Sequence, residues 1–499
     1  MSIGAIGISA NWLLELKFEE KYARIKQLRW GPIVLSFTFI LYAIWATQAN
    51  NFDLAIKDLL IKLPLLSMPI VIGTSKYFNK KELRTLLIAF FTGLLLSSII
   101  SALIFFDLIP PKEKTGDFRE LSRTMHHIRY SLLISISVSI ALFLILYRNV
   151  KEKKWLSILI CWLIVVLIFI PSITGATALI IGISILLAFT KKSYEKANLY
   201  IGYIWYFTLV IIGVYFSFII YDFYQVKDKN DLSNLNESSV QGEKYIHDIN
   251  NPILENGNYV YINIAEKECR KSWNSRSNCH FDSTDNKGQK LKFTLYRYLT
   301  SKGLKKDSLG LSSLTNQDIF NIEKGITSVK KYNAIEGRIR EVLLEIQLFL
   351  GQGQANHHSV SQRIVFFKAG LLAFNKNFWL GVGTGGVKKE IFNQYDQIAQ
   401  DFDEETKKKG VHNQFIALLI TFGLPGAILF LSALIYPVFF VQKDIKPLYI
   451  AFCFIIITGF ISDDMLDRQA GVTIFITLNS IMLFAIKKND QSVLGSSNV

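Results

Sequence analysis

Two basic side chains in the C-terminal third of the sequence have types and positions suited to chemistry. His412 stands at the start of an apolar run, and an imidazole there could accept a proton from a hydroxyl group. Arg363 leads an amphipathic stretch, and its guanidinium could bind a phosphate through two parallel hydrogen bonds. Each residue also has a plainer explanation. His412 could cap a helix where it meets water, and Arg363 could extend toward lipid headgroups.

A glycine-rich segment at residues 377–386 lies between these two residues. It contains Gly383 and Gly385, and glycine permits backbone conformations and close approach that a side chain would prevent. The segment could admit a sugar or a diphosphate close to the backbone, or it could be a plain turn. Asn413 follows His412 directly and could contribute a hydrogen bond to the same ligand.

A short acidic segment near the C-terminus is a further candidate. Asp463 and Asp464 are followed by Asp467 and Arg468. These side chains could position sugar hydroxyls, or they could form a salt-bridged turn in which Asp467 and Arg468 neutralise each other.

Motifs of nucleotide-driven and metal-dependent enzymes are absent from the sequence. There is no Gly-x-x-x-x-Gly-Lys-Ser/Thr loop, no Gly-x-Gly-x-x-Gly segment that opens a helix after a strand, no His-Glu-x-x-His pair and no Gly-x-Ser-x-Gly elbow. The neighbouring side chains of His126 and His127 would diverge on any regular element, which argues against chelation by that pair. We therefore expect no metal site and no cofactor.

The composition is that of a membrane protein. Of the 499 residues, 51% are hydrophobic and only 19% are charged, below the roughly 25% that is typical of soluble chains. The apolar residues form continuous runs of about 20, long enough to cross roughly 30 Å of hydrocarbon as helices. This pattern excludes a soluble domain and a disordered chain, and it argues against a β-barrel. The net charge of +15 is typical of basic loops between spans, so no nucleic-acid partner is expected.

The runs predict an all-α polytopic membrane protein with about ten, and up to twelve, transmembrane helices. Seven runs precede a long polar segment and three follow it, near residues 31–49, 58–75, 85–109, 130–147, 155–170, 173–190, 199–222, 412–440, 447–462 and 470–486. The second run is the weakest because Lys57 and Lys62 interrupt its start. The predicted parts are an N-terminal segment 1–30, an N-terminal bundle 31–222, a large loop 223–411 with an interfacial helix near 363–380, C-terminal helices 412–486 and a tail 487–499.

Lys and Arg residues in the short segments indicate the orientation. Twenty of them lie in segments that are cytoplasmic if the N-terminus is cytoplasmic, against about eight in the short outer segments. Both termini are therefore expected in the cytoplasm, and the large loop outside or in the periplasm. Cys269 and Cys279 both lie in that loop, where an oxidising compartment would allow a disulfide, and two free thiols are the alternative.

Four motifs occur in a fixed order between residues 363 and 426. They are Arg-x-x-x-x-Lys, Leu-Gly-Val-Gly-Thr-Gly, His-Asn-Gln-Phe at the start of an apolar run, and Gly-Leu-Pro-Gly inside that run. In this order and placement they resemble the O-antigen ligase and O-antigen polymerase superfamily. The resemblance covers roughly residues 360–440, and the layout of spans on either side agrees with it. The long loop is similar to that of Bacteroidetes-type members.

This resemblance implies glycan transfer at the outer face of a bacterial inner membrane, by a metal-independent membrane glycosyltransferase with a GT-C-like helical fold. An undecaprenyl-diphosphate-linked glycan would be the donor, and lipid A-core or another glycan the acceptor. His412 would activate the acceptor hydroxyl, and Arg363 would stabilise the leaving diphosphate. The sugar would be inverted at its anomeric carbon. Membrane lipids would surround the protein.

One position departs from the family pattern. Members usually carry an arginine at the outer start of a span, where this chain has Ile173. Isoleucine cannot supply the charge, so either another cation binds the diphosphate or donor binding is impaired. Arg129, at the outer end of the fourth run, is the leading substitute. Arg123, Arg338 and Arg340 are further candidates, and each could also be a solvated loop charge.

Other functions remain open from the sequence. A polysaccharide polymerase or a protein O-oligosaccharyltransferase would use the same donor with a different acceptor. A transporter of lipid-linked sugars belongs to another class, and the long loop and the lack of paired Gly/Pro-interrupted spans argue against it. An inactive scaffold would account for Ile173. We favour a ligase that moves glycan to lipid A-core.

Overall fold

The computed structural model of the chain describes residues 2–110, 122, 125–148, 150–170, 172–189, 196–227, 232, 235–251, 253–352, 359–399 and 402–486. The predicted tail at 487–499 lies outside these ranges. The chain divides into two compact units. We call Met1–Tyr206 with Arg363–Val499 the bundle, and Phe207–Gln362 the loop domain. The loop domain ends well before residue 411, where the predicted loop ends, because residues 363–411 pack with the bundle.

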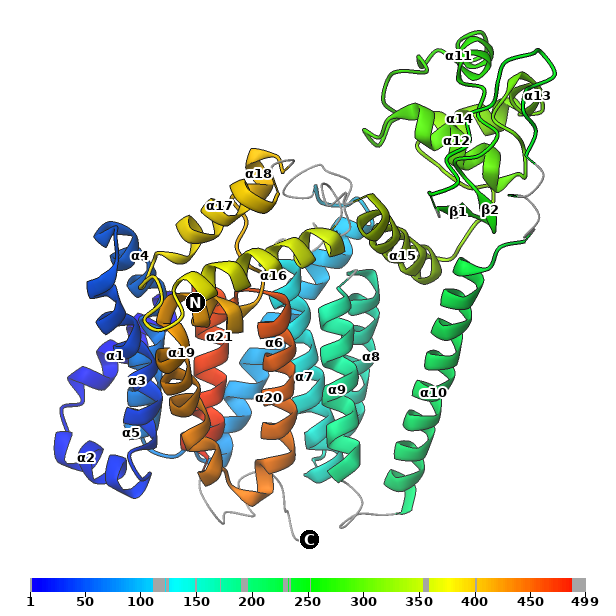
Figure 1. Cartoon of the computed structure of the whole chain (residues 1–499). Helices are drawn as coiled ribbons and strands as arrows, with labels where there is room; N and C mark the ends of the chain where they lie inside the picture. The colour runs from blue at the N-terminus through cyan, green and yellow to red at the C-terminus, as the bar shows by residue number, and fades with distance from the viewer. Residues whose placement is uncertain are drawn as a thin grey trace. The chain divides into compact units, whose positions relative to one another are not determined.

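The helices of the bundle begin and end close to the predicted spans (Figure 1). They are α1 (Ser2–Leu14), α2 (Phe18–Gln27), α3 (Gly31–Trp45), α4 (Phe52–Lys62), α5 (Pro64–Thr74), α6 (Lys80–Phe105), α7 (His127–Tyr147), α8 (Lys153–Phe169), α9 (Ile173–Phe189), α16 (Ser359–Lys376), α17 (Val387–Ile398), α18 (Glu404–Lys407), α19 (Gln414–Ile435), α20 (Lys446–Ser462) and α21 (Gln469–Ser480). The long helix α10 (Lys196–Tyr224) contributes to both units.

The apolar helices make the chain a helical membrane protein. Among the described residues, six helical stretches have the length and the apolar composition to cross a membrane. Shorter apolar helices, including α9, accompany them. The helical class is therefore confirmed, while the count of about ten spans stays a prediction.

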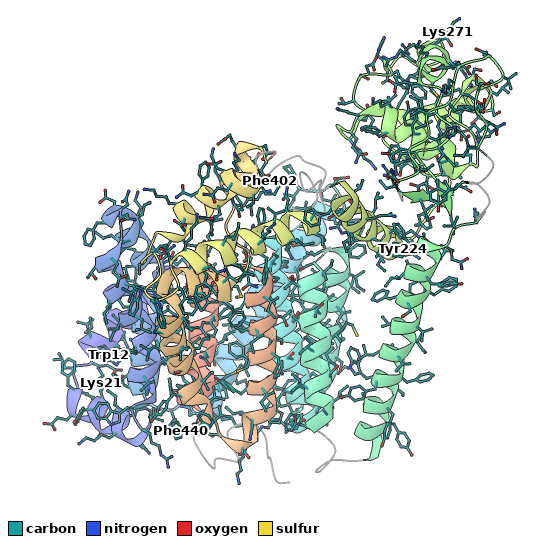
Figure 2. The ribbon with its side chains drawn as sticks, viewed as in Figure 1. Trp12, Lys21, Tyr224, Lys271, Phe402 and Phe440 are labelled. Atoms are coloured by element: carbon teal, nitrogen blue, oxygen red, sulfur yellow. The ribbon has the colours of Figure 1, made fainter. Side chains whose placement is uncertain are left out.

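Near the N-terminus, the Lys21 ammonium on α2 lies over the ring of Trp12 on α1, 4.3 Å from its centre, in a cation–π contact (Figure 2).

Small residues allow the bundle helices to approach closely. The hydroxyls of Ser131 and Ser135 on α7 donate to carbonyls of their own helix, and that of Ser135 also lies 3.0 Å from the Gly175 carbonyl on α9. On α9, a Cβ added at Gly175 would lie 2.3 Å from the Cβ of Ser131. Such small-residue contacts are common between membrane helices. Ser172, just before α9, lies 2.8 Å from the hydroxyl of Ser131, so α7 and α9 begin side by side.

Helix α19 is interrupted at Gly423, within the Gly-Leu-Pro-Gly motif. Gly423 has φ 66° and ψ −177°, which is not helical, and Pro425 follows it. A proline cannot donate the helical hydrogen bond, so the carbonyls before it need other donors. Val382 donates its N–H to the Ile420 carbonyl at 2.8 Å, and Gly383 donates to the Thr421 carbonyl at 3.1 Å. The glycine-rich segment therefore completes the hydrogen bonding of the broken helix.

The same segment also contacts α3. Leu424 donates its N–H to the Phe378 carbonyl, and the indole of Trp45 donates to the Leu380 carbonyl at 2.7 Å. The hydroxyl of Thr384 donates to the Tyr42 carbonyl at 2.6 Å. The close approach requires glycine in the segment, because a Cβ added at Gly383 would lie 2.9 Å from the Trp45 carbonyl oxygen. The two motifs that the sequence shows as separate glycine patterns thus form one interlocked structure.

The loop domain has a hydrophobic core of its own. It contains α11 (Glu266–Asn274), α12 (Leu291–Ser301), α13 (Ser308–Ser312), α14 (Asn316–Glu323), α15 (Ala334–Gln352) and a hairpin of β1 (Leu254–Glu255) and β2 (Asn258–Tyr259). Trp273, Phe281 and Leu299 are fully buried in the core. The polar stretch of the sequence is therefore a folded domain and not an extended loop.

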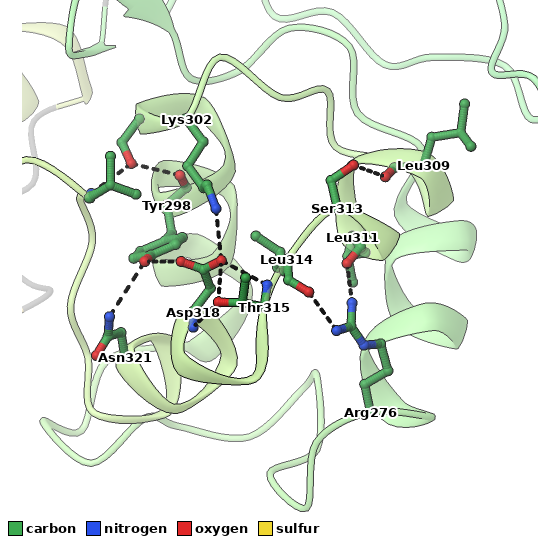
Figure 3. Close-up of polar contacts among 12 residues, drawn as sticks. Arg276, Tyr298, Lys302, Leu309, Leu311, Ser313, Leu314, Thr315, Asp318 and Asn321 are labelled. Carbon is green, nitrogen blue, oxygen red and sulfur yellow. Dashed lines mark hydrogen bonds and ion pairs between the residues drawn. The ribbon is translucent and has the colours of Figure 1, made fainter.

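Polar side chains fix the start of α14 to α12 (Figure 3). The carboxylate of Asp318 accepts hydrogen bonds from the Tyr298 hydroxyl at 2.6 Å, from Lys302 at 2.7 Å and from the Thr315 amide at 2.8 Å. Burial alone would raise the pKa of Asp318, but these donors outweigh it and hold the pKa well below its ordinary value.

The structure has no bond between Cys269 and Cys279, and their disulfide stays a prediction. Both cysteines are free thiols; Cys269 is buried in the core of the loop domain, and Cys279 packs against that core. The carbonyl of Cys279 accepts a hydrogen bond from the Trp273 indole at 2.8 Å. The structure thus corresponds to the alternative of two free thiols, with both residues serving the packing of the domain.

We predict that Gly423→Ala destabilises the bundle. An added Cβ would lie 2.3 Å from the Trp379 carbonyl oxygen, and the positive φ alone costs about 1–3 kcal/mol for a residue with a side chain. Thermal unfolding of the purified protein in detergent should show a clearly lower midpoint. Gly93→Ala on α6 is the matched control, because no atom lies within 4 Å of its added Cβ. Equal midpoints for the two variants would contradict the interlocked structure.

Candidate functional site

A cluster of charged residues lies where three helical segments of the bundle meet. Arg129 is in the first turn of α7, His412 directly precedes α19, and Asp463 and Asp464 form the turn after α20. The ion pair between Arg129 and Asp463 and the hydrogen bonds from His412 and Asn413 to Asp464 show that these helix ends lie together. Segments that are far apart in the sequence therefore bring a guanidinium, an imidazole and two carboxyl groups together.

Asp464 fixes the backbone at His412. One carboxylate oxygen of Asp464 accepts the His412 N–H at 3.0 Å, and the other accepts the Asn413 N–H at 2.9 Å. His412 has φ 52°, a left-handed conformation that is uncommon for residues with a side chain. Asn413 caps α19, since its side-chain oxygen accepts the Ile416 N–H at 3.1 Å. The strained turn before α19 is thus held by one buried carboxylate.

Asp463 links the imidazole of His412 to Arg129. The Nδ1 atom of His412 lies 3.8 Å from Oδ1 of Asp463, and Nη2 of Arg129 lies 2.8 Å from Oδ2. The Asp463 and Arg129 side chains are only 6% and 11% exposed, whereas that of His412 is 30% exposed. The imidazole is therefore the member of this group that is most accessible to a substrate.

The surroundings of the two adjacent carboxyl groups shift their pKa values in opposite directions. Burial alone would raise the pKa of Asp463, but the donors and positive charge of His412 and Arg129 outweigh it and hold the pKa below its ordinary value. Burial raises the pKa of Asp464 to about 7, and the nearby Asp467 carboxylate adds to the rise. Asp463 is thus an ionised partner for His412 near neutral pH, while Asp464 is harder to ionise than an ordinary aspartate.

A second ion pair borders the turn. The ammonium of Lys62 is 1% exposed and lies 2.5 Å from Asp58 and 3.7 Å from Asp467. It also lies 4.6 Å from the centre of the Tyr42 ring. The prediction that Asp467 and Arg468 neutralise each other is wrong, because among the described residues Asp467 pairs with Lys62. The lysine that weakened the second predicted span is a buried partner of the acidic turn.

An aromatic group packs against His412. The Phe366 ring on α16 lies 5.5 Å from the imidazole, and Tyr395 and Phe402 pack on Phe366 (Figure 2 labels Phe402). Arg363 is exposed and lies one helical turn before Phe366 on α16. Helix α16 therefore carries both the ring that supports His412 and the arginine predicted to bind a diphosphate.

Not every predicted residue joins this cluster. Arg338 and Arg340 belong to the loop domain, where Arg338 lies 2.5 Å from Glu341 and Arg340 pairs with Asp222 and Glu336. Both arginines are thus engaged with carboxylates of their own domain. Arg123 lies outside the described residues.

Gly383 and Gly385 have a packing role in the structure. A Cβ added at Gly383 would lie 2.9 Å from the Trp45 carbonyl oxygen, and one at Gly385 would lie 2.8 Å from the Ala55 amide nitrogen. Neighbouring backbone therefore occupies the space that was predicted to admit a ligand. Their contact with substrate stays a prediction.

Ile173 is 61% exposed at the first position of α9. The contact between Ser131 and Ser172 sets the start of α9 beside the start of α7, which carries Arg129. A cation therefore stands on the neighbouring helix at the same end of the bundle. This arrangement supports Arg129 as the substitute for the missing arginine.

Comparison with known families addresses the resemblance directly. Residues 308–431 match the sequence model of a family described as O-antigen ligase. Over this segment, which we call the O-antigen ligase domain after the matched model, the chain is similar to that family. That domain includes Arg363, the glycine-rich segment, His412 and the kink of α19, while Arg129 and Asp463 lie outside the matched residues. Among curated proteins, the search finds no match.

Sequence reasoning identified only part of the cluster at the O-antigen ligase domain. It singled out His412, Arg363 and Arg129, but it treated Asp463 and Asp464 chiefly as a turn. Two adjacent carboxylates at the end of an apolar run were the available signal, because such groups are costly to place near lipid without partners. Among the described residues, no group of His, Cys, Asp and Glu could hold a metal ion.

We predict a pH-dependent effect of Asp464→Asn. Because the folded-state pKa of Asp464 is raised, its contribution to stability is full below its ordinary pKa and is lost as pH rises through about 7. The melting temperature of the wild type relative to Asp464→Asn should therefore fall between pH 4 and pH 7.5. Asp53→Asn, at an exposed residue of α4, is the control. A difference that stays constant with pH would contradict the assignment.

Proposed function

We propose that this protein is a glycosyltransferase of the bacterial inner membrane that moves glycan from undecaprenyl diphosphate to lipid A-core. The observation that carries the proposal is the linked group of His412, Asp463 and Arg129 beside the O-antigen ligase domain. A general base next to a cation suits the attack of a hydroxyl on a sugar that is leaving a diphosphate. We further propose that this group and the loop domain face the periplasm, with both termini in the cytoplasm.

In the proposed reaction, an acceptor hydroxyl oxygen attacks the anomeric carbon of the donor sugar. The bond between that carbon and the diphosphate oxygen breaks, and the electron pair leaves with the diphosphate. The hydroxyl proton passes to His412, which Asp463 holds in one orientation and whose positive charge Asp463 offsets. Attack on the face opposite the leaving group inverts the anomeric carbon.

The developing negative charge of the diphosphate needs preorganised cations. Arg363 is exposed on α16, one turn from the ring that packs on His412, and would bind the diphosphate through its planar guanidinium. Arg129 binds Asp463 through Nη2, and we assign the rest of its guanidinium to the diphosphate, as the substitute for the missing arginine. Its positive charge would also keep Asp463 ionised. Two arginines can supply this stabilisation without a divalent metal.

We predict that His412→Ala abolishes transfer while the protein stays folded. Removing a general base should lower the turnover rate by about 10²–10⁴-fold. The assay uses purified protein, lipid-linked glycan donor and lipopolysaccharide that lacks O-antigen, with capped product separated on a gel. His280→Ala in the loop domain is the control, because that side chain is 68% exposed. Full transfer by His412→Ala would reject the mechanism.

We predict that Arg129→Lys weakens use of the donor more than it weakens folding. Lysine keeps the positive charge beside Asp463 but lacks the planar fork of the guanidinium. The KM for the lipid-linked donor should rise several-fold with an unchanged melting temperature. Arg84→Lys is the matched control, because Arg84 forms an exposed ion pair with Glu152 at 2.7 Å. An unchanged donor KM in Arg129→Lys would remove Arg129 from the donor site.

A ligase and a polymerase would use the same donor, so the acceptor distinguishes these two functions. In a deletion strain, loss of capped lipopolysaccharide with accumulation of long lipid-linked chains supports the ligase. Caps that consist of a single repeat would instead indicate a polymerase with the same donor.

A further inference from the structure

The loop domain contains a polar cavity that the His412 site does not use. Its volume is about 340 Å³, within the range of roughly 300–1,000 Å³ that is common for small-molecule sites. The end of α10, the β1–β2 hairpin, α12 and α15 all contribute to its wall. Every lining residue belongs to the loop domain, so the cavity exists within one folded unit.

The charges around the cavity are balanced. Three acidic and three basic side chains line it, namely Asp222, Glu255, Glu341, Lys287, Arg297 and Arg340. A site for a diphosphate would need an excess of positive charge. The balance instead suits a neutral ligand or one with few charges that offers many hydroxyl groups.

The wall of the cavity is held in place before any ligand binds. The Tyr332 hydroxyl donates to Oδ1 of Asn256 at 2.7 Å, and the guanidinium of Arg340 lies 4.3 Å from the centre of the Tyr332 ring. Arg340 is fixed in turn by Asp222 and by Glu336 at 3.0 Å. Side chains that are already ordered lose little entropy when a ligand binds.

Hydrogen-bonding groups in this wall remain available. Nε of Arg297 donates to Glu255 at 2.8 Å, and among the described residues its guanidinium has no other hydrogen-bond partner. Within the same described part of the chain, the side chains of Gln289 and Thr327 have no hydrogen-bond partner either. A guanidinium, an amide and a hydroxyl therefore face a space large enough for a small ligand.

We propose that this cavity is a saccharide subsite that holds a stretch of the transferred glycan or of its acceptor. The choice of a saccharide as the ligand rests on the proposed function. The existence of the cavity and the balance of its charges are observed independently of that function. Planar polar side chains can form paired hydrogen bonds with neighbouring hydroxyls of a sugar ring. Arg297 would be the main donor, with Glu255 holding it in position, and Gln289 also lines the cavity.

The test is saturation-transfer NMR with the full-length protein in detergent. The probes are the O-polysaccharide and the core oligosaccharide, each released by mild acid from lipopolysaccharide of the source strain, and titration gives their Kd values. Arg297→Lys keeps the ion pair to Glu255 but loses the fork, so the Kd of the bound probe should rise about tenfold or more. Gln289→Ala removes an exposed amide and should also raise the Kd without disturbing the fold.

Matched controls separate this proposal from the proposed function. Arg270→Lys, at a partly exposed ion pair on α11 of the same domain, should bind both probes like the wild type. His412→Ala should bind them normally and yet transfer no glycan. Binding of the O-polysaccharide would assign the cavity to the donor glycan, and binding of the core oligosaccharide would assign it to the acceptor.

Two results would overturn the proposal. One is no binding of either probe, or binding that Arg297→Lys and Gln289→Ala leave unchanged. The other is displacement of the glycan by an equal concentration of pyrophosphate, which would show that the cavity prefers an anion. In either case His412→Ala should still lose transfer, because that result tests the proposed function and not the cavity.

Discussion

The end of the bundle that carries His412 depends on partners that compensate two adjacent buried carboxyl groups. A charged group near the hydrocarbon is costly unless it has a partner, and Asp463 and Asp464 have different partners. Asp463 is balanced by a guanidinium and an imidazole, whereas Asp464 is satisfied by two backbone N–H groups. One carboxylate thus orients the side chain of His412 and the other fixes its backbone. The convergence of α7, α19 and α20 follows from these bonds.

The packing of the bundle keeps these groups in register. The small hydroxyl side chains of Ser131 and Ser135 on α7 bond both within their own helix and to the first residues around α9, so the two helices approach closely. At the other side of the site, the broken helix α19 is completed by the glycine-rich segment. In both places, small residues let two segments of the chain approach more closely than bulky side chains would allow. The helix ends that carry charge are therefore held by short, rigid connections.

The sequence predicted the helices well and the polar contacts poorly. Continuous apolar runs determine spans almost by themselves, because the bilayer leaves few alternatives. Pairing is different: Lys62 looked like a defect in a weak span, yet it is a buried partner of Asp467. Gly383 looked like a ligand contact, yet it donates to α19. Such contacts join separate segments of the sequence, and a local pattern contains no information about them.

The interruption at Gly423 divides α19 into two halves with separate anchors. The half that begins after His412 is fixed by the backbone of the glycine-rich segment, while the half after Pro425 packs by its side chains. Backbone hydrogen bonds do not depend on side-chain type. Lipid-facing residues beyond the break can therefore vary with the thickness and composition of the host membrane, while the depth and rotation of His412 stay constant.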